Sequence, residues 1–267
     1  MKNKTNLIAI SGKAGSGKSI VGKIIQYLLC SNKGNVKIND IIISNEHDWW
    51  LEEQSNFEIK QFSNKLKQIV SILTGIPIND LESQEIKNKV LGEEWWKFDE
   101  TVIKNWLLNF YTRKEIDEDK SIFLNNYKNS PKGIEKPTVR DLLQTLGTNL
   151  LREQLHPNIF INALFADYRE KVDFDNNLPM NKNFIITDLR FKNEKKAVED
   201  RGGITIRVNR ITNNVLIDND THAVTDSQHI SETDLDTSYF KYTITNDSSI
   251  EDLIESVKEI LIKEKLI

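Results

Sequence analysis

A glycine-rich stretch near the amino end limits what this chain can fold into more than any other feature. An apolar run at residues 7–10 leads into residues 12–19, which read GKAGSGKS and fit the spacing G-x-x-x-x-G-K-S. Apolar residues then recur at helical spacing over residues 21–29. The pattern predicts a strand, a tight loop and a helix in direct succession.

The residue types in this loop suit the binding of phosphate groups. Glycines let successive backbone N–H groups turn towards phosphate oxygens, and the positive end of the following helix faces the same anion. Lys18 is expected to reach the β- and γ-phosphates, and the Ser19 hydroxyl to bind Mg²⁺. A glycine-rich turn that only connects a strand to a helix is the simpler alternative. The predicted ATP-binding residues are Gly12, Lys13, Ala14, Gly15, Ser16, Gly17, Lys18 and Ser19.

The composition sets limits on compartment and partners. A chain of 267 residues with 38% hydrophobic residues can bury a sizeable core in one large domain. The formal net charge of −4 gives no general attraction to nucleic acid or to an anionic membrane, so neither is expected as a partner. A single cysteine, Cys30, cannot form an internal disulfide, and the cysteine and histidine spacing does not match a zinc site. With no signal-peptide pattern and no long apolar run, we predict a cytoplasmic protein.

Segments of strand type alternate with segments of helix type along the chain. Strands are predicted at residues 41–43, 57–62, 183–188, 204–208 and 242–245. Helices are predicted from residue 62, from Pro137, at residues 159–168, from Arg190 to about residue 201, and after a capping box formed by Ser248 and Glu251. This alternation predicts an α/β fold, with a P-loop NTPase core and a mostly parallel sheet flanked by helices.

Two stretches depart from the alternation. Residues 78–136 are charged and contain Trp95, Trp96 and Trp106, and we interpret them as a helical insertion within one domain. The tryptophans either pack the insertion onto the core or stack on a base. Residues 207–232 are polar and lack periodicity, so they form either a lid over the phosphates or a mobile acidic loop.

Several side chains outside the loop are candidates for chemistry. On the helix after residue 137, Arg140, Gln144 and Thr148 form a polar stripe that faces either solvent or a ligand, with Arg152 at its edge. Asp188 ends an apolar strand, where a carboxylate that supports Mg²⁺ is expected, although it also suits the N-cap of the next helix.

The sequence leaves open the roles of three further residues. Arg190 follows the strand of Asp188 and either meets a ligand at the carboxyl edge of the sheet or forms a surface ion pair. Arg210 stands at the entrance of the predicted lid, and His229 within it is either catalytic or structural.

The kind of reaction follows from what is missing as well as from what is present. The sequence contains no Asn-Lys-x-Asp guanine signature, so ATP is the expected nucleotide, and it shows no serine or cysteine triad. A phosphate acceptor is mostly ionised at pH 7 and needs no base, whereas the repulsion between two polyanions must be offset by Mg²⁺, lysine and arginine.

Taken together, the motifs resemble those of the bacteriophage-type deoxynucleoside monophosphate kinases, a branch of the P-loop NMP-kinase-like proteins. They span nearly the whole chain. The resembling segments are residues 12–19, 62–67 (FSNKLK), 140–148 (RDLLQTLGT) with Arg152, 187–194 (TDLRFKNE), 229–232 (HISE) and 244–247 (ITND).

The resemblance implies transfer of the ATP γ-phosphoryl group to a deoxynucleoside 5′-monophosphate (dNMP), with Mg²⁺ as cofactor and a homodimer as a possible assembly. It implies that the insertion at about 78–136 lies on the acceptor side and that residues 207–232 form a lid. The implied catalytic residues are Lys18, Asp188, Arg190, Arg152 and Arg210. The implied acceptor-binding residues are Arg140, Gln144, Thr148 and Lys67, and the implied metal ligands are Ser19 and Asp188.

The working hypothesis is therefore a Mg²⁺- and ATP-dependent deoxynucleotide kinase. Two alternatives remain at this point: a P-loop kinase of another phosphorylated small molecule, and a nucleotide-dependent regulatory NTPase.

Overall fold

The computed structural model describes residues 6–44, 46–92, 95, 137–166, 168, 171–173, 178–180, 183–210 and 233–267. The chain divides into two compact units. We call Met1–Lys65 with Asn158–Ile267 the sheet unit, and Leu66–Pro157 the helical unit. None of the helices in the described residues is both long and apolar enough to span a membrane.

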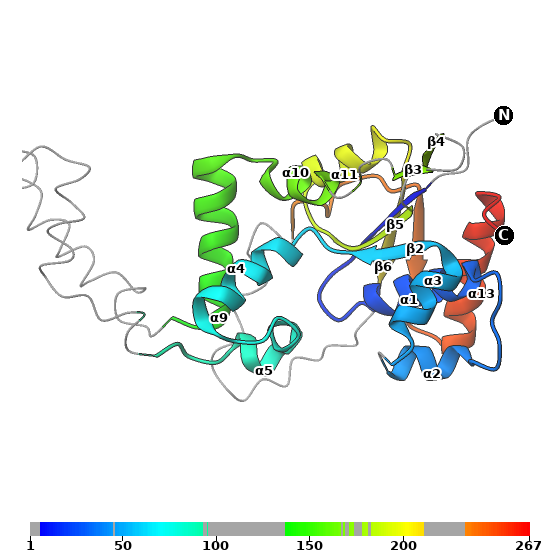
Figure 1. The fold of residues 1–267 in the computed structure, drawn as a ribbon, viewed down its shortest axis with the longest axis horizontal. Coiled ribbons are helices and arrows are strands. Elements are labelled where there is room, and N and C mark those ends of the chain that lie inside the picture. Colours follow the sequence, from blue (N-terminus) through cyan, green and yellow to red (C-terminus); the bar gives the residue numbers. More distant parts are fainter. Residues whose placement is uncertain are drawn as a thin grey trace, which may run out of the picture. The chain divides into compact units, whose positions relative to one another are not determined.

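Among its described residues, the sheet unit contains a five-stranded sheet in which every neighbouring pair is parallel (Figure 1). The strands lie in the order β2 (Phe57–Lys60), β5 (Asn183–Leu189), β1 (Leu7–Ser11), β6 (Ile204–Asn209) and β7 (Tyr242–Thr245). The predicted α/β fold with a parallel sheet is confirmed, as are four of the five predicted strands. A small antiparallel pair, β3 (Lys171–Asp173) and β4 (Leu178–Met180), has no counterpart in the predictions.

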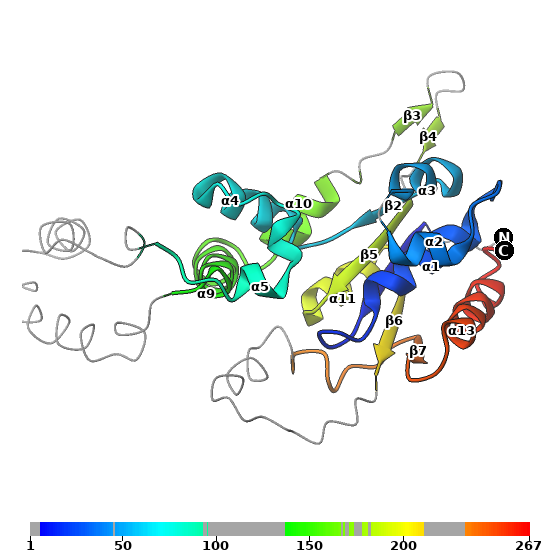
Figure 2. The same ribbon diagram turned by 90° about the horizontal axis from the view of Figure 1, so that it is seen from below.

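Helices cover both faces of the sheet (Figures 1 and 2). The crossover from β1 to β2 runs in one direction across the sheet, and the crossover from β5 to β6 runs in the other. Because such crossovers are right-handed, α1 (Lys18–Leu29) and α11 (Lys192–Glu199) lie on opposite faces. Helix α13 (Ile250–Lys263) packs beside α1, and their apolar side chains share one buried cluster with Ile8 and Ile10 of β1.

The predicted strand at residues 41–43 is wrong, because these residues end a helix, α2 (Ile38–Ile43). A run of three isoleucines fits a buried strand and a buried helix equally well by periodicity. In the structure Ile41 is fully buried in a small cluster with Cys30 and with Leu51 of α3 (Asp48–Ser55). That cluster selects the helix, and burial raises the pKa of the Cys30 thiol despite the nearby Lys33.

The helical unit contains α4 (Asn64–Thr74, which begins in the sheet unit), η1 (Asp80–Glu82), α5 (Gln84–Lys87), α9 (Val139–Gln144) and η3 (Thr145–Leu155). Helix α4 ends before Gly75, which has a φ of 72°. η3 is a π-helix, in which hydrogen bonds join residues five apart.

The polar stripe was predicted for an α-helix, which turns 100° per residue, and this geometry does not apply from Thr145 onwards. Leu150 is 44% exposed. Gly147 is buried instead, against Leu66, and a Cβ at Gly147 would lie 2.7 Å from a methyl group of Leu66. Of the predicted polar stripe, Arg140 and Gln144 share α9, whereas Thr148 lies on the wider π-helix.

Two helix starts are shifted from their predicted positions. Helix α9 begins at Val139 rather than at Pro137, because the Thr138 hydroxyl accepts from the Asp141 N–H while the Asp141 carboxylate accepts from the Thr138 N–H. The capping box of α13 uses Ser249 and Asp252, one residue after the predicted pair of Ser248 and Glu251. For α13 the sequence offers two capping pairs, and the structure uses the second.

The chain crosses between the units twice, and both crossings are held by the turn between β5 and α11. Before the first crossing, the Asp188 carboxylate accepts hydrogen bonds from the backbone N–H groups of Phe62 and Ser63 at 2.8 and 2.9 Å. After the second crossing, Asn158 accepts a hydrogen bond of 2.9 Å from the side chain of Asn193. The chain segments just before and just after the helical unit are thus both hydrogen-bonded to residues between Asp188 and Asn193 of the sheet unit.

Much of the predicted insertion and lid lies outside the described residues. In the insertion at about 78–136, this applies to residues 93–94 and 96–136, which include Trp96 and Trp106. In the lid at about 207–232, it applies to residues 211–232, which include His229. Both segments stay predictions.

Candidate active site

The glycine-rich loop joins β1 to α1 at the carboxyl edge of the sheet. β1 ends at Ser11 and α1 begins at Lys18, as predicted. Gly15 and Gly17 have φ angles of 73° and 96°, in the left-handed region that side chains with a Cβ rarely adopt. Ser19 is exposed on the first turn of α1. The loop therefore has the tight curvature that a phosphate cradle requires.

The Lys18 side chain folds back over this loop. Its ammonium group donates to the carbonyl oxygens of Gly12 at 2.8 Å and Lys13 at 2.7 Å. A peptide unit is planar and trans, so its N–H points away from its C=O. Lys18 thus turns two loop carbonyls towards itself and the N–H groups of Lys13 and Ala14 in the opposite direction.

Two residues that directly follow neighbouring strands hold the carbonyl groups of Gly15 and Ser16 in the loop. Arg210, directly after β6, donates to the Gly15 carbonyl at 3.3 Å. Asn246, directly after β7, donates from its side-chain amide to the Ser16 carbonyl at 2.9 Å. The predicted phosphate-binding loop and Arg210 are therefore brought together, whereas no sequence argument gave Asn246 a role.

Ser16 packs inside the loop. Its side chain is buried, and its hydroxyl has no hydrogen-bond partner within the described part of the chain. A Cβ on Gly12 would collide with this hydroxyl and with the backbone carbonyl of Val208. Gly12 is thus required for close packing against the end of β6, in addition to any contact with a ligand.

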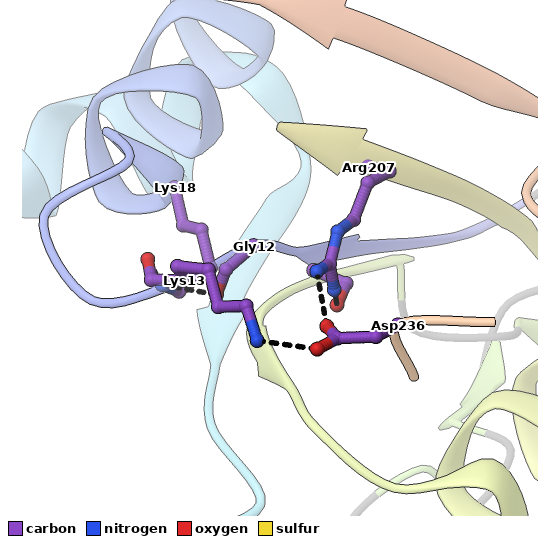
Figure 3. Close-up of polar contacts among 6 residues, drawn as sticks. Gly12, Lys13, Lys18, Arg207 and Asp236 are labelled. Carbon is purple, nitrogen blue, oxygen red and sulfur yellow. Dashed lines mark hydrogen bonds and ion pairs between the residues drawn. The ribbon is translucent and has the colours of Figure 1, made fainter. Parts of the chain in front are cut away.

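A chain of polar contacts extends from the loop to a segment after the predicted lid (Figure 3). Asp236 lies between two cations, accepting from Lys13 at 2.6 Å and from Arg207 at 3.0 Å. Arg207 lies on β6 and also donates to the Ser11 hydroxyl at 3.0 Å. The Arg207 side chain is only 14% exposed, and its guanidinium group lies 5.7 Å from the ring centre of Phe240.

The charge state of Asp236 follows from these contacts. Partial burial would raise the pKa of its carboxyl group, but the hydrogen bond and charge of Lys13, together with Arg207, outweigh burial and lower the pKa below its ordinary value. Asp236 is therefore ionised throughout the neutral range. An anion at Lys13 matters for any phosphate ligand, because phosphate would compete for the same ammonium group.

Sequence reasoning assigned no role to Arg207 or Asp236. Arg207 carried a usable signal, since it interrupts an apolar strand two positions before the carboxyl end of β6 and aligns with Ser11 in the register. Asp236 gave none, because its contacts join residues more than twenty positions apart.

Asp188 does not cap α11, so that alternative is wrong. The N–H groups of Arg190 and Phe191 donate to the Glu194 carboxylate instead, and that of Lys192 donates to Asp234. Asp188 itself accepts three hydrogen bonds, since the Ser63 hydroxyl adds a third at 2.7 Å. A carboxylate offers about four acceptor positions, so these bonds leave about one for another ligand.

Arg190, predicted beside Asp188, leaves β5 at the carboxyl edge of the sheet and is partly buried. The sheet unit thus holds the loop, Asp188, Arg190 and Arg210 at one edge, where ligands of parallel sheets bind.

The remaining predicted residues all belong to the helical unit. Lys67 on α4 is buried and forms an ion pair with Glu82. Arg140 on α9 donates to the amide oxygens of Gln84, at 2.6 Å, and Asn88, at 3.2 and 3.3 Å. Gln144, Thr148 and Arg152 are partly buried on α9 and η3.

No cluster of three or more histidine, cysteine or acidic side chains suited to a metal ion occurs among the described residues.

Comparison with known proteins places the chain in a family. A family model described as deoxynucleotide monophosphate kinase matches residues 6–257, which is most of the chain. A search of curated proteins returned no match. The matched range begins just before β1 and ends within α13, so it includes every site residue described above.

Proposed function

The chain belongs to the deoxynucleotide monophosphate kinase family, and from that premise we propose that it transfers the γ-phosphoryl group of ATP to a dNMP, releasing ADP and the deoxynucleoside diphosphate. The observation that carries the proposal is the loop at residues 12–17, in which Lys18 and Arg210 hold three carbonyl groups in fixed directions. A loop held in this way presents N–H groups to an anion before the anion arrives.

The sheet unit supplies the donor side of the proposed reaction. The loop N–H groups and Lys18 hold the β- and γ-phosphates, while Lys13 and Arg210 balance the charge that spreads over the transferred group. Arg190 is proposed to act at the same sheet edge. Residues with these charges offset the repulsion between donor and acceptor, which is the main barrier to phosphoryl transfer between two polyanions.

The helical unit supplies the acceptor side. Arg140 is the proposed contact of the monophosphate, because the amide oxygens of Gln84 and Asn88 orient its guanidinium without adding negative charge. Gln144, Thr148 and Lys67 are proposed to complete the acceptor site, and Arg152 to stabilise transition-state charge. No general base is required, because the acceptor phosphate is largely ionised at neutral pH.

Mg²⁺ is the proposed cofactor, and the residues fit it. Magnesium typically takes one or two protein oxygen ligands together with substrate phosphates and water, so it does not need an acidic cluster. Ser19, exposed at the start of α1, and the remaining acceptor position of Asp188 are the proposed protein ligands. When bound, Mg²⁺ would neutralise charge on the donor phosphates.

An acceptor screen tests the proposed function. The full-length protein is incubated with Mg²⁺ and ATP, with each of the common dNMPs and NMPs in turn, and ADP and the diphosphate product are quantified. We expect ADP to form rapidly only when a dNMP is present, in a one-to-one ratio with the diphosphate. Hydrolysis of ATP at the same rate without an acceptor would instead indicate a regulatory NTPase. Turnover only with another phosphorylated metabolite would indicate a different kinase.

Replacing Asp236 with asparagine is expected to strengthen ATP binding. The substitution removes one anion that competes with phosphate for the ammonium group of Lys13. Both partners are well exposed, with side chains 50% and 38% accessible, so the ion pair is worth at most about 1 kcal/mol. The dissociation constant for ATP, measured by calorimetric titration at neutral pH, should therefore fall by up to about fivefold.

Asp234→Asn is the matched control for this prediction. It makes the same change of charge two residues away, in a side chain that contacts Lys192 rather than Lys13. Weaker ATP binding in Asp236→Asn than in wild type would contradict competition and would indicate that Asp236 supports the bound nucleotide.

A further inference from the structure

The turn after β7 contains a sequence motif, residues 244–247, to which the proposed function assigns no role. Its second polar residue, Asn246, is partly buried and makes one hydrogen bond to the end of β6 and one to the loop. The backbone N–H of Asn246 donates to the carbonyl of Asn209 at 2.7 Å, at the end of β6. Its side-chain amide donates to the carbonyl of Ser16 at 2.9 Å. Asn246 therefore reaches the phosphate-binding loop from a fixed backbone position.

The contact with Ser16 determines where one particular N–H group points. The Ser16 carbonyl and the Gly17 N–H belong to the same peptide unit, which is planar and trans. Holding the carbonyl towards Asn246 therefore directs the Gly17 N–H away from Asn246. Gly17 has a φ of 96° and immediately precedes α1, so this N–H lies at the positive end of the helix.

The side chain at position 246 must be a hydrogen-bond donor. The partner is a carbonyl oxygen, which only accepts, so the amide NH₂ must face it. An aspartate of the same shape would place an anionic oxygen against that carbonyl and would repel it. The fit is close on the other side as well, because a Cβ on Gly17 would collide with the Asn246 amide nitrogen. Gly17 and Asn246 are thus complementary in space as well as in hydrogen bonding.

We propose that Asn246 is a positioning residue for phosphate binding, which holds the Ser16 carbonyl so that the Gly17 N–H faces the donor phosphates. The inference rests on the proposed function, since it takes the loop to bind a nucleoside triphosphate. It assigns Asn246 no contact with the substrate. Its effect is confined to the phosphates, and the base and the acceptor are untouched.

Three variants of the full-length protein test this role: Asn246→Asp, Asn246→Ala and the control Ser248→Asp. Ser248 is exposed, lies two residues further along the same turn and forms a side-chain hydrogen bond with Asp247 rather than with the loop, so its substitution adds the same charge without affecting Ser16. Binding of ATP and of inorganic tripolyphosphate is measured by calorimetric titration, and KM values for ATP and for the dNMP are measured separately. Thermal unfolding and circular dichroism report on the fold.

For Asn246→Asp we expect ATP binding to weaken by about 30-fold or more, because a hydrogen bond is lost and a buried carbonyl faces an anion. Asn246→Ala should weaken it by about tenfold, the usual effect of losing one such bond. Binding of tripolyphosphate should weaken by the same factors as binding of ATP, and the KM for the dNMP should not change. The dissociation constant for ATP of Ser248→Asp should stay within about twofold of the wild-type value.

Two results would overturn the inference while leaving the proposed function intact. One is ATP binding by a folded Asn246→Ala variant at wild-type strength. The other is weaker binding of ATP with unchanged binding of tripolyphosphate, which would place the effect at the base. If Asn246→Asp fails to fold, the alanine variant decides. A wild-type protein that binds ATP but phosphorylates no dNMP would contradict the proposed function alone, because the phosphate-binding comparison would still stand.

Discussion

Lys18→Ala is expected to lower kcat/KM for the proposed kinase reaction by about a thousandfold or more. The ammonium group of Lys18 lies against the loop, and removal of one charged or preorganised donor from a transition-state site typically costs about two to three orders of magnitude. The substitution also removes the two hydrogen bonds that hold the carbonyls of Gly12 and Lys13. The loss of rate should therefore lie at or above the upper end of that range, and steady-state kinetics with varied ATP measures it.

A loss of activity is informative only if the fold persists. Lys258→Ala provides the control, since Lys258 is an exposed lysine on α13 that pairs with Glu255. Both variants should melt close to the wild-type temperature, and only Lys18→Ala should lose activity. A Lys18→Ala enzyme within tenfold of wild type would show that the loop does not hold the transferred phosphate.

Asp188→Ala is expected to produce the largest loss of stability among the site variants, about 2–4 kcal/mol. The backbone N–H groups of Phe62 and Ser63 would lose their acceptor, and an unsatisfied, partly buried donor costs about 1–3 kcal/mol. Urea unfolding followed by circular dichroism gives the change in the free energy of unfolding. Ser63→Ala, which removes only the hydroxyl bond to Asp188, should cost about 1 kcal/mol.

Asp188→Asn and Ser63→Ala together separate the anchoring role of Asp188 from a role in metal binding. If Asp188 also binds Mg²⁺, Asp188→Asn should raise the Mg²⁺ concentration for half-maximal activity, whereas Ser63→Ala should leave it unchanged. Equal magnesium dependence in wild type and Asp188→Asn would show that Asp188 acts only as an anchor.

Local patterns predicted the central part of the fold well. The spacing of Gly12, Gly17 and Lys18 dictates a strand, a loop and a helix in order, because few other backbones place a lysine there. The apolar runs that became β5, β6 and β7 are each bounded by polar or glycine residues, so both their type and their limits were predictable. The site residues on those strand ends follow from the rule that parallel strands share a carboxyl edge.

What could not be predicted depends on contacts distant in sequence. Ile41 enters a helix because Cys30 and Leu51 bury it, and neither is visible to a periodicity count. Within the π-helix from Thr145, Gly147 packs closely against Leu66, a residue distant in sequence. In the site, Asp188 was correctly placed at a strand end, but its partners at Phe62 and Ser63 lie more than a hundred residues away. The contact between Asp236 and Lys13 was unpredictable for the same reason, because these residues lie 223 positions apart.

The two anchors on the turn between β5 and α11 have a consequence for how such a protein diversifies. Phe62, Ser63 and Asn158 lie in the sheet unit on either side of the helical unit, and Asp188 and Asn193 of the same sheet unit hold them by hydrogen bonds. None of these contacts involves residues 66–157. Under the proposed function, a substitution or a change of length within residues 66–157 would therefore alter the acceptor side and leave these hydrogen bonds in place.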